Sequence, residues 1–107
     1  TVLNQAQKYS CVILLKHIND YISDGERCYI VSGGNAGLTK GGTGDVLAGV
    51  VASLNTTNNQ IDSSVIGSYL IKKSAEILYE KQHFWFNAND IISTIPLALK
   101  RLLDQQD

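Results

Sequence analysis

The sequence predicts an α/β fold, because strand signals come first along the chain and helix signals follow. Cys11–Leu15 is a continuous apolar run of strand length, which is typical of a strand inside a parallel sheet that helices cover. An Asp24-Gly25 pair lies between two further strand-like runs. A polar loop, Gly33–Gly44, holds six of the chain's nine glycines and continues directly into an apolar helix. The order of these signals places the loop at a sheet edge, where open α/β sheets commonly bind ligands.

Composition limits the class of protein. The chain has 107 residues, of which 44% are hydrophobic and 18% charged, enough for one modest core and one domain at most. The net charge of −1 and the pI near 6.0 indicate neither a nucleic-acid partner nor an anionic membrane surface. No apolar run approaches the roughly 20 residues that span a bilayer.

The first residues and the cysteines indicate whether the chain is part of a longer protein and what redox compartment it occupies. No methionine occurs, so we expect the chain to be a fragment of a longer protein, and its N-terminus does not resemble a signal peptide. Cys11 and Cys28 lack Cys-x-x-Cys spacing, which predicts free thiols in a reducing compartment rather than a disulfide or a metal site.

The N-terminal part predicts a helix and a hairpin around the first strand. Thr1–Tyr9 is typical of the end of a surface helix, packed through Val2, Leu3 and Ala6. Tyr21–Ser23 and Arg27–Val31 flank Asp24-Gly25-Glu26, which predicts a hairpin whose second strand leads into the glycine loop.

Two helices are expected directly after the loop. Val46–Leu54 is apolar on nearly every face and predicts a short buried helix, followed by a surface loop at Asn55–Gln60. The second helix begins at Asp62 or Ser63 and ends near Lys81. Its expected inward side chains are Val65, Ile66, Tyr69, Leu70, Ile77 and Leu78, and its expected water-facing ones are Lys72, Lys73 and Glu76.

The C-terminal part predicts a last helix and a short aromatic stretch before it. Asn87 or Asn89 caps this helix, which is broken or kinked near Pro96 and ends around Leu103. Phe84–Phe86 suits packing better than base stacking, because three adjacent aromatic side chains cannot all face one way. The two histidines, His17 and His83, have no clustered neighbours, so no metal site is predicted.

The glycine loop suits an anion. Residues without Cβ let successive N–H groups point the same way and let a ligand approach the main chain. The first turn of the following helix, Thr43–Val46, adds unpaired N–H groups and the positive end of the helix dipole. Neither the Walker A pattern nor the dinucleotide fingerprint matches, because Lys40 precedes a glycine and Leu47 stands where the last fingerprint glycine belongs.

Asp45 closes the loop and has two interpretations. It is a helix-capping residue, or it is a base that accepts a proton from a hydroxyl group attacking a phosphate. A carboxylate beside a phosphate is otherwise repelled, which favours the second interpretation.

The segment Gly41–Gly49 resembles the signature of the ribokinase-like superfamily. The longer match from Gly34-Asn35-Ala36-Gly37 through Lys40 into Gly41–Gly49 resembles the nucleotide-dependent NAD(P)H-hydrate dehydratases, and so does Asn89–Pro96 near the end. This resemblance implies a ribokinase-like three-layer α/β sandwich, of which residues 1–107 form the C-terminal portion of one domain.

The resemblance implies roles for two segments and one acid. Asp45 would be the catalytic residue that holds the hydrated nicotinamide. His17 departs from the family's glycine, and its Cβ would either crowd the nucleotide or force a different turn at that edge of the pocket. The residues implied to bind the nucleotide are Lys16, His17, Ile18, Asn19 and Asp20 on one edge, and Asn35, Ala36, Gly37, Leu38, Thr39, Lys40, Gly41, Gly42, Thr43 and Gly44 on the other.

The activity implied is dehydration of the S form of NADHX or NADPHX, with ATP favoured over ADP as phosphoryl donor and with Mg²⁺. Two alternatives stay open: a small-molecule kinase of the same superfamily, and a non-catalytic nucleotide-binding fragment. The expected location is cytoplasmic, with a mitochondrial pool and a homo-oligomer both left open.

Overall fold

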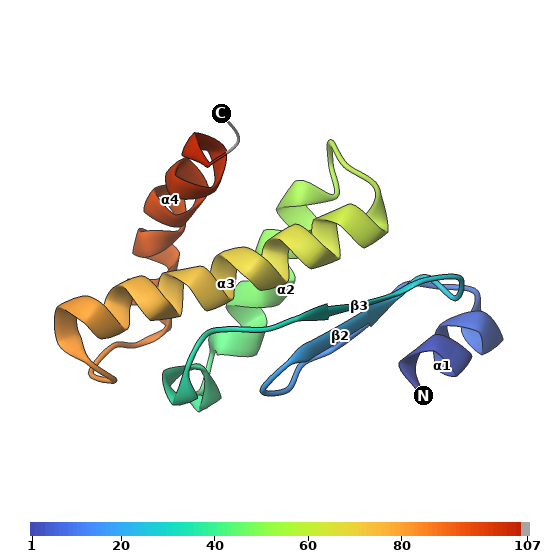
Figure 1. The fold of residues 1–107 in the computed structure, drawn as a ribbon, viewed down its shortest axis with the longest axis horizontal. Coiled ribbons are helices and arrows are strands. Elements are labelled where there is room, and N and C mark those ends of the chain that lie inside the picture. The colour runs from blue at the N-terminus through green and yellow to red at the C-terminus, as the bar shows by residue number, and fades with distance from the viewer. Residues whose placement is uncertain (106–107) are drawn as a thin grey trace.

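A computed structural model describes residues 1–105, which form one sheet with helices on both sides. α1 lies on one side of the sheet and α3 on the other, and α2 and α4 pack on α3 (Figure 1). No helix in the described part is long and apolar enough to cross a membrane. The elements are α1 (Val2–Tyr9), β1 (Ile13–Leu15), β2 (Asp20–Ser23), β3 (Cys28–Val31), the 3₁₀ turn η1 (Ala36–Thr39), α2 (Thr43–Leu54), α3 (Gln60–Gln82) and α4 (Ala88–Asp104).

The three strands pair antiparallel in the order β1–β2–β3. Leu14 lies opposite Ile22, and Ile22 lies opposite Tyr29. The parallel pairing expected for Cys11–Leu15 is therefore wrong within residues 1–105. Parallel neighbours need a crossover of about a dozen residues or more, whereas the short turn Lys16–Asn19 joins β1 to β2 and reverses the chain.

The β2–β3 hairpin is confirmed, and its turn is fixed by side chains. Gly25 has φ +95°, a conformation that L side chains rarely adopt, so glycine is required there. Ser23 Oγ accepts from the Gly25 N–H (3.0 Å) and donates to the Arg27 carbonyl (2.6 Å). Asp24 Oδ1 accepts from the N–H groups of Glu26 and Arg27, both at 2.9 Å. The Arg27 N–H, and then that of Glu26, lower the pKa of Asp24 below its ordinary value.

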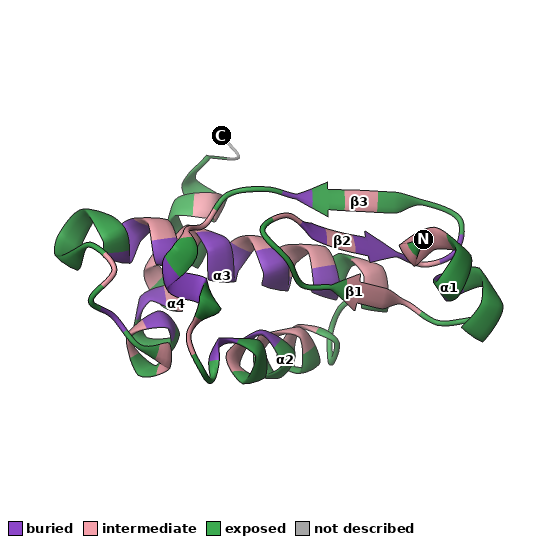
Figure 2. Cartoon of the chain, turned by 90° about the horizontal axis from the view of Figure 1, so that it is seen from below, coloured by how far each residue is buried: buried purple, intermediate pink, exposed green. Residues whose placement is uncertain are grey.

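The core lies among the helices and between α3 and the sheet. Figure 2 shows buried positions concentrated on α3 and β2. Each fully buried aliphatic side chain contributes about 1.5–3 kcal/mol from removed apolar surface. The main cluster joins α3 to the glycine loop and to both neighbouring helices, and consists of Leu38, Leu47, Ile71, Ala75, Leu78, Phe86 and Ile91.

Two expectations about the middle helices need correction. The helix after the loop is not wholly buried: α2 buries only Thr43 and Leu47, and Ala48 and Ala52 are exposed. Only one side of α2 packs on α3 and α4, so small apolar residues remain uncovered on the other side. α3 begins earlier than expected, because Asn59 caps it by accepting from the Asp62 N–H (2.8 Å).

The ends of the chain follow the prediction more closely. α1 packs through Ala6, which is fully buried, and both cysteines are free. Asn87 caps α4, which continues past Pro96 to Asp104 and so is not broken there. Trp85 is exposed while Phe86 is buried, so the aromatic stretch does not present one face.

Candidate functional site

The glycine loop leaves β3 through two residues that need glycine. Gly33 and Gly34 have φ +105° and +75°. Asn35 then caps η1: its Oδ1 accepts from the Gly37 N–H (3.0 Å), and its Nδ2 donates to the Ala75 carbonyl on α3 (2.9 Å). The first half of the loop is therefore tied to α3 and has few groups left for a ligand.

The second half of the loop is open. Gly42 is the N-cap of α2 at φ +88° and supplies no side-chain cap. Gly41 and Gly42 form a turn, and within residues 1–105 the N–H groups of residues 41–45 have no main-chain acceptor at normal hydrogen-bond distance and angle. A Cβ placed on Gly41 or Gly44 would meet nothing within 4 Å. Unpaired amides at the positive end of a helix form a site for an anion such as phosphate.

Lys16 and Thr43 support this end of α2. Thr43 is buried, and its hydroxyl lies 2.7 Å from the Leu38 carbonyl and 3.0 Å from the Lys40 carbonyl. The Lys16 ammonium donates to the same Leu38 carbonyl (3.1 Å) and to Thr43 Oγ1 (3.3 Å). Lys16 thus places a positive charge beside the start of α2 and joins β1 to the loop.

Asp45 lies in the first turn of α2, three residues after the N-cap Gly42. It is exposed, and its carboxylate has no hydrogen bond or ion pair to any described residue. The capping interpretation of Asp45 is wrong, because the N-cap is Gly42 and no side-chain cap bond forms. A free carboxylate beside five unpaired amides is available for proton transfer.

The structure gathers most of the two implied nucleotide edges around one hollow, here called the loop cavity, of about 570 Å³. Its walls come from the turn after β1, from the first half of the glycine loop and from the inner sides of α2 and α3. The lining residues are Lys16, His17, Ile18, Asp20, Gly33, Gly34, Asn35, Ala36, Leu38, Thr39, Leu47, Ile71 and Lys72.

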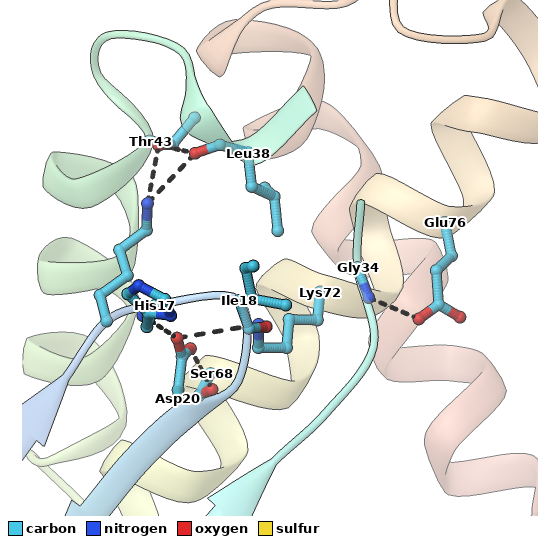
Figure 3. Close-up of polar contacts among 10 residues, drawn as sticks. His17, Ile18, Asp20, Gly34, Leu38, Thr43, Ser68, Lys72 and Glu76 are labelled. Atoms are coloured by element: carbon cyan, nitrogen blue, oxygen red, sulfur yellow. Dashed lines mark hydrogen bonds and ion pairs between the residues drawn. The ribbon is translucent and has the colours of Figure 1, made fainter. Parts of the chain in front are cut away.

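A buried polar network borders the loop cavity, and Figure 3 shows its side chains. Asp20 Oδ1 accepts from the His17 N–H (3.0 Å), and Oδ2 accepts from Ser68 Oγ (2.6 Å). The Lys72 ammonium lies 3.7 Å from Asp20 Oδ1 and donates to the Ile18 carbonyl (2.8 Å). A buried carboxylate and a buried ammonium are each costly alone, so the pair and its hydrogen bonds stabilise one another.

The expectation that Lys72 faces water is wrong, whereas the Glu76 side chain is still 41% exposed. Lys72 is 4% exposed, and Glu76 Oε2 accepts from the Gly34 N–H (2.8 Å). Ser68, Lys72 and Glu76 form a stripe at i, i+4 and i+8 on α3, and this spacing places them on one helix face. The spacing of these three polar residues is the sequence signal that could have identified them as neighbours of the loop cavity.

Several implied site residues lie elsewhere. Asn19, Gly37 and residues 40–44 do not line the loop cavity. The Lys40 ammonium donates to the carbonyls of Phe84 and Phe86, the latter at 2.6 Å, and lies 4.4 Å from the Phe86 ring centroid. It is therefore held by the α3–α4 connection, away from the open amides.

A second hollow of about 650 Å³ lies between β1 and the exposed side of α2, and Gly44 and Lys16 border it. Its remaining walls are mostly small or apolar, including Leu14, Ala48 and Ala52. In the described part of the chain, no three His, Cys, Asp or Glu side chains gather as metal ligands do.

Comparisons with known proteins identify the family. The model of the family Carb_kinase, described as NAD(P)H-hydrate dehydratase, matches residues 1–97. The bifunctional NAD(P)H-hydrate repair enzyme Nnr of Archaeoglobus fulgidus is 38% identical over 100 residues, which cover 94% of this chain and 22% of that enzyme. The ADP-dependent (S)-NAD(P)H-hydrate dehydratase of Cenarchaeum symbiosum is 33% identical, over 89% of this chain and 33% of that protein.

The fold agrees with a solved relative. The ADP/ATP-dependent NAD(P)H-hydrate dehydratase from Bacillus subtilis, co-crystallized with ATP/Mg²⁺, superposes with a TM-score of 0.82 at 28% identity. The match covers 94% of this chain and 37% of that one, so the chain spans about a fifth to two fifths of its relatives' length. It is an α/β fragment of the ribokinase-like dehydratase fold, and it belongs to the NAD(P)H-hydrate dehydratase family.

Proposed function

We propose that the natural protein carrying this chain uses ATP or ADP to dehydrate the S form of NADHX and NADPHX, which returns NADH and NADPH. One observation carries the proposal: the Asp45 carboxylate is unpaired and exposed in the first turn of α2, beside N–H groups that are also unpaired within residues 1–105. Membership of the family supports the same reaction.

Asp45 would accept the proton of the hydroxyl group on the reduced nicotinamide ring as that oxygen attacks the terminal phosphorus. The bond from this phosphorus to the leaving nucleotide oxygen breaks. The N–H groups around Gly42–Gly44 would stabilise the charge that develops on the phosphoryl oxygens. Phosphate then leaves the ring with the C–O electron pair, assisted by the ring nitrogen, and a proton lost from the adjacent carbon completes the double bond.

The nucleotide would lie in the loop cavity with its phosphates directed to the start of α2. Lys16 suits this arrangement, because it borders both the cavity and the second hollow and bonds to Thr43 at the helix start. Mg²⁺, when bound, would neutralise phosphate charge beside the start of α2.

The test is an assay of the natural protein with NADPHX and either ATP or ADP in the presence of Mg²⁺. Recovery of the near-ultraviolet absorbance of the reduced nicotinamide, together with release of inorganic phosphate, is the expected result. The nucleotide that supports the faster recovery is the donor. A stable phosphorylated product would instead assign a small-molecule kinase, and nucleotide binding without turnover would assign a non-catalytic binding protein.

A further inference from the structure

We propose that Lys72 is a positioning residue that holds the two walls of the loop cavity at a fixed separation. The proposal rests on the nucleotide-binding function proposed for that cavity. Lys72 extends from α3 and lines the loop cavity; its ammonium contacts the Ile18 carbonyl, and its stem lies beside Gly34 (Figure 3). It does not touch Asp45 or the open amides, so its effect would be on nucleotide affinity rather than on the chemical step.

The ammonium fixes the wall formed by the turn Lys16–Asn19. It donates to the Ile18 carbonyl (2.8 Å) and lies 3.7 Å from Asp20 Oδ1, which itself accepts from the His17 N–H. Two consecutive main-chain units of the turn are therefore held by one buried ion pair. The side chains of Lys72 and Asp20 are only 5% and 4% exposed, so water does not compete for these bonds.

The stem of Lys72 fixes the opposite wall. A Cβ on Gly34 would lie 3.2 Å from Lys72 Cγ and 2.9 Å from Leu38 Cδ1, so the glycine loop rests directly on the lysine stem. One turn further along α3, Glu76 holds the Gly34 N–H (2.8 Å). The loop and the turn are thus joined through consecutive turns of a single rigid helix.

The ammonium is already occupied by Asp20 and Ile18, so it is not a free cation for phosphate. Its loss would release the turn and leave the cavity wider and less uniform. A ligand must then select or restore the bound shape, which lowers apparent affinity without changing the reacting groups.

The experiment replaces Lys72 by methionine in the natural protein, which keeps the stem and removes the charge. We expect the Kd for ATP or ADP, measured by isothermal titration calorimetry, and the nucleotide KM to rise about tenfold, as for one lost charge-assisted hydrogen bond. We expect kcat to stay within about twofold. Lys81→Met, on the exposed end of the same helix, is the matched control and should change neither constant.

A second variant separates positioning from stability. Lys72→Met alone leaves the Asp20 charge buried and should lower Tm, whereas Lys72→Met with Asp20→Asn removes both charges and should recover Tm. If Lys72 positions the turn, the nucleotide KM of the double variant stays high; recovery of KM together with Tm would overturn the proposal. An unchanged KM in Lys72→Met would also overturn it. Failure of the unaltered protein to bind either nucleotide would instead overturn the proposed function.

Discussion

The first turns of α2 and α4 each contain an aspartate at the same position, but only the aspartate of α4 forms capping hydrogen bonds. Asp45 and Asp90 each lie three residues after the N-cap of their helix. In α4, Asp90 Oδ2 accepts from the Asn87 N–H (2.9 Å), and Asn87 Oδ1 accepts from the Asp90 N–H (3.0 Å), a complete capping box. In α2 the N-cap is Gly42, and neither bond forms.

The difference shows that the start of α4 is stabilised by its own side chains and that the start of α2 is not. In α4 the capping box gives the N–H groups of Asn87 and Asp90 their acceptors, so its acid contributes to stability. α2 leaves the N–H groups of residues 41–45 and the Asp45 carboxylate without partners in the described part of the chain. The terminal phosphate of a bound nucleotide would accept hydrogen bonds from these N–H groups, and the hydroxyl group of a substrate would donate to the Asp45 carboxylate.

The sharpest test of this comparison replaces each aspartate by alanine in the natural protein. Asp45→Ala should reduce dehydration of NADPHX by about 10²- to 10⁴-fold, because a positioned base is lost, with little change in Tm. Asp90→Ala should reduce the free energy of unfolding by about 1 kcal/mol and leave turnover nearly unchanged. Rates from the coupled assay and Tm from calorimetry check both. Normal turnover in Asp45→Ala would remove the role assigned to that carboxylate.

The two halves of the glycine loop should respond differently to an added methyl group, because the first half is packed and the second half is open. In the packed half, a Cβ on Gly37 would lie 2.2 Å from the Phe86 ring, so Gly37→Ala should destabilise the protein by about 1–3 kcal/mol through overpacking. Denaturant unfolding measures this loss. An unchanged midpoint would mean that the loop does not rest on Phe86.

In the open half, Gly44→Ala should have the reverse effect. A Cβ there meets nothing within 4 Å, and alanine favours a helix, so stability should rise by at most about 1 kcal/mol. The added methyl group would cover part of the amide surface at the start of α2, so nucleotide affinity should fall. Thermal shift with and without ATP gives both quantities. A rise in affinity would show that phosphate does not approach this turn.

The smallest effect is expected at the hairpin, far from either helix start. The N–H groups of Arg27 and Glu26 lower the pKa of Asp24 in the folded state. Stability from these bonds is therefore present above the unfolded pKa of about 3.9 and is lost as pH falls through the folded value. Amide exchange of the hairpin should quicken at that low pH. Asp24→Asn, which cannot ionise, should not show this added acid dependence.

Local signals in the sequence predicted the parts of the fold that depend on neighbouring residues. Asp24-Gly25 predicted the hairpin and Asn87 the start of α4, because a turn and a cap are each made within a few residues. The glycine loop before a helix start predicts an anion site, and this stays a prediction.

The parts that depend on distant contacts could not be predicted in this way. The helical pattern places Lys72 toward water, yet the carbonyl of Ile18, 54 residues away, gives it a buried partner. The apolar run at β1 predicts a parallel sheet, but residues that are apolar on both faces do not fix the direction of the neighbouring strand, which is antiparallel.

The sequence alone determined most of the elements and the place of the glycine loop and Asp45 before α2, since caps and turns follow from short-range geometry. The tertiary structure decided which polar groups are used up and which are left over. Asn35 and Lys40, implied as ligands, are bound to Ala75 and to Phe84 and Phe86, while the amides of residues 41–45 stay open. The physical reason is that hydrogen-bond partners are assigned only when segments far apart in the chain meet.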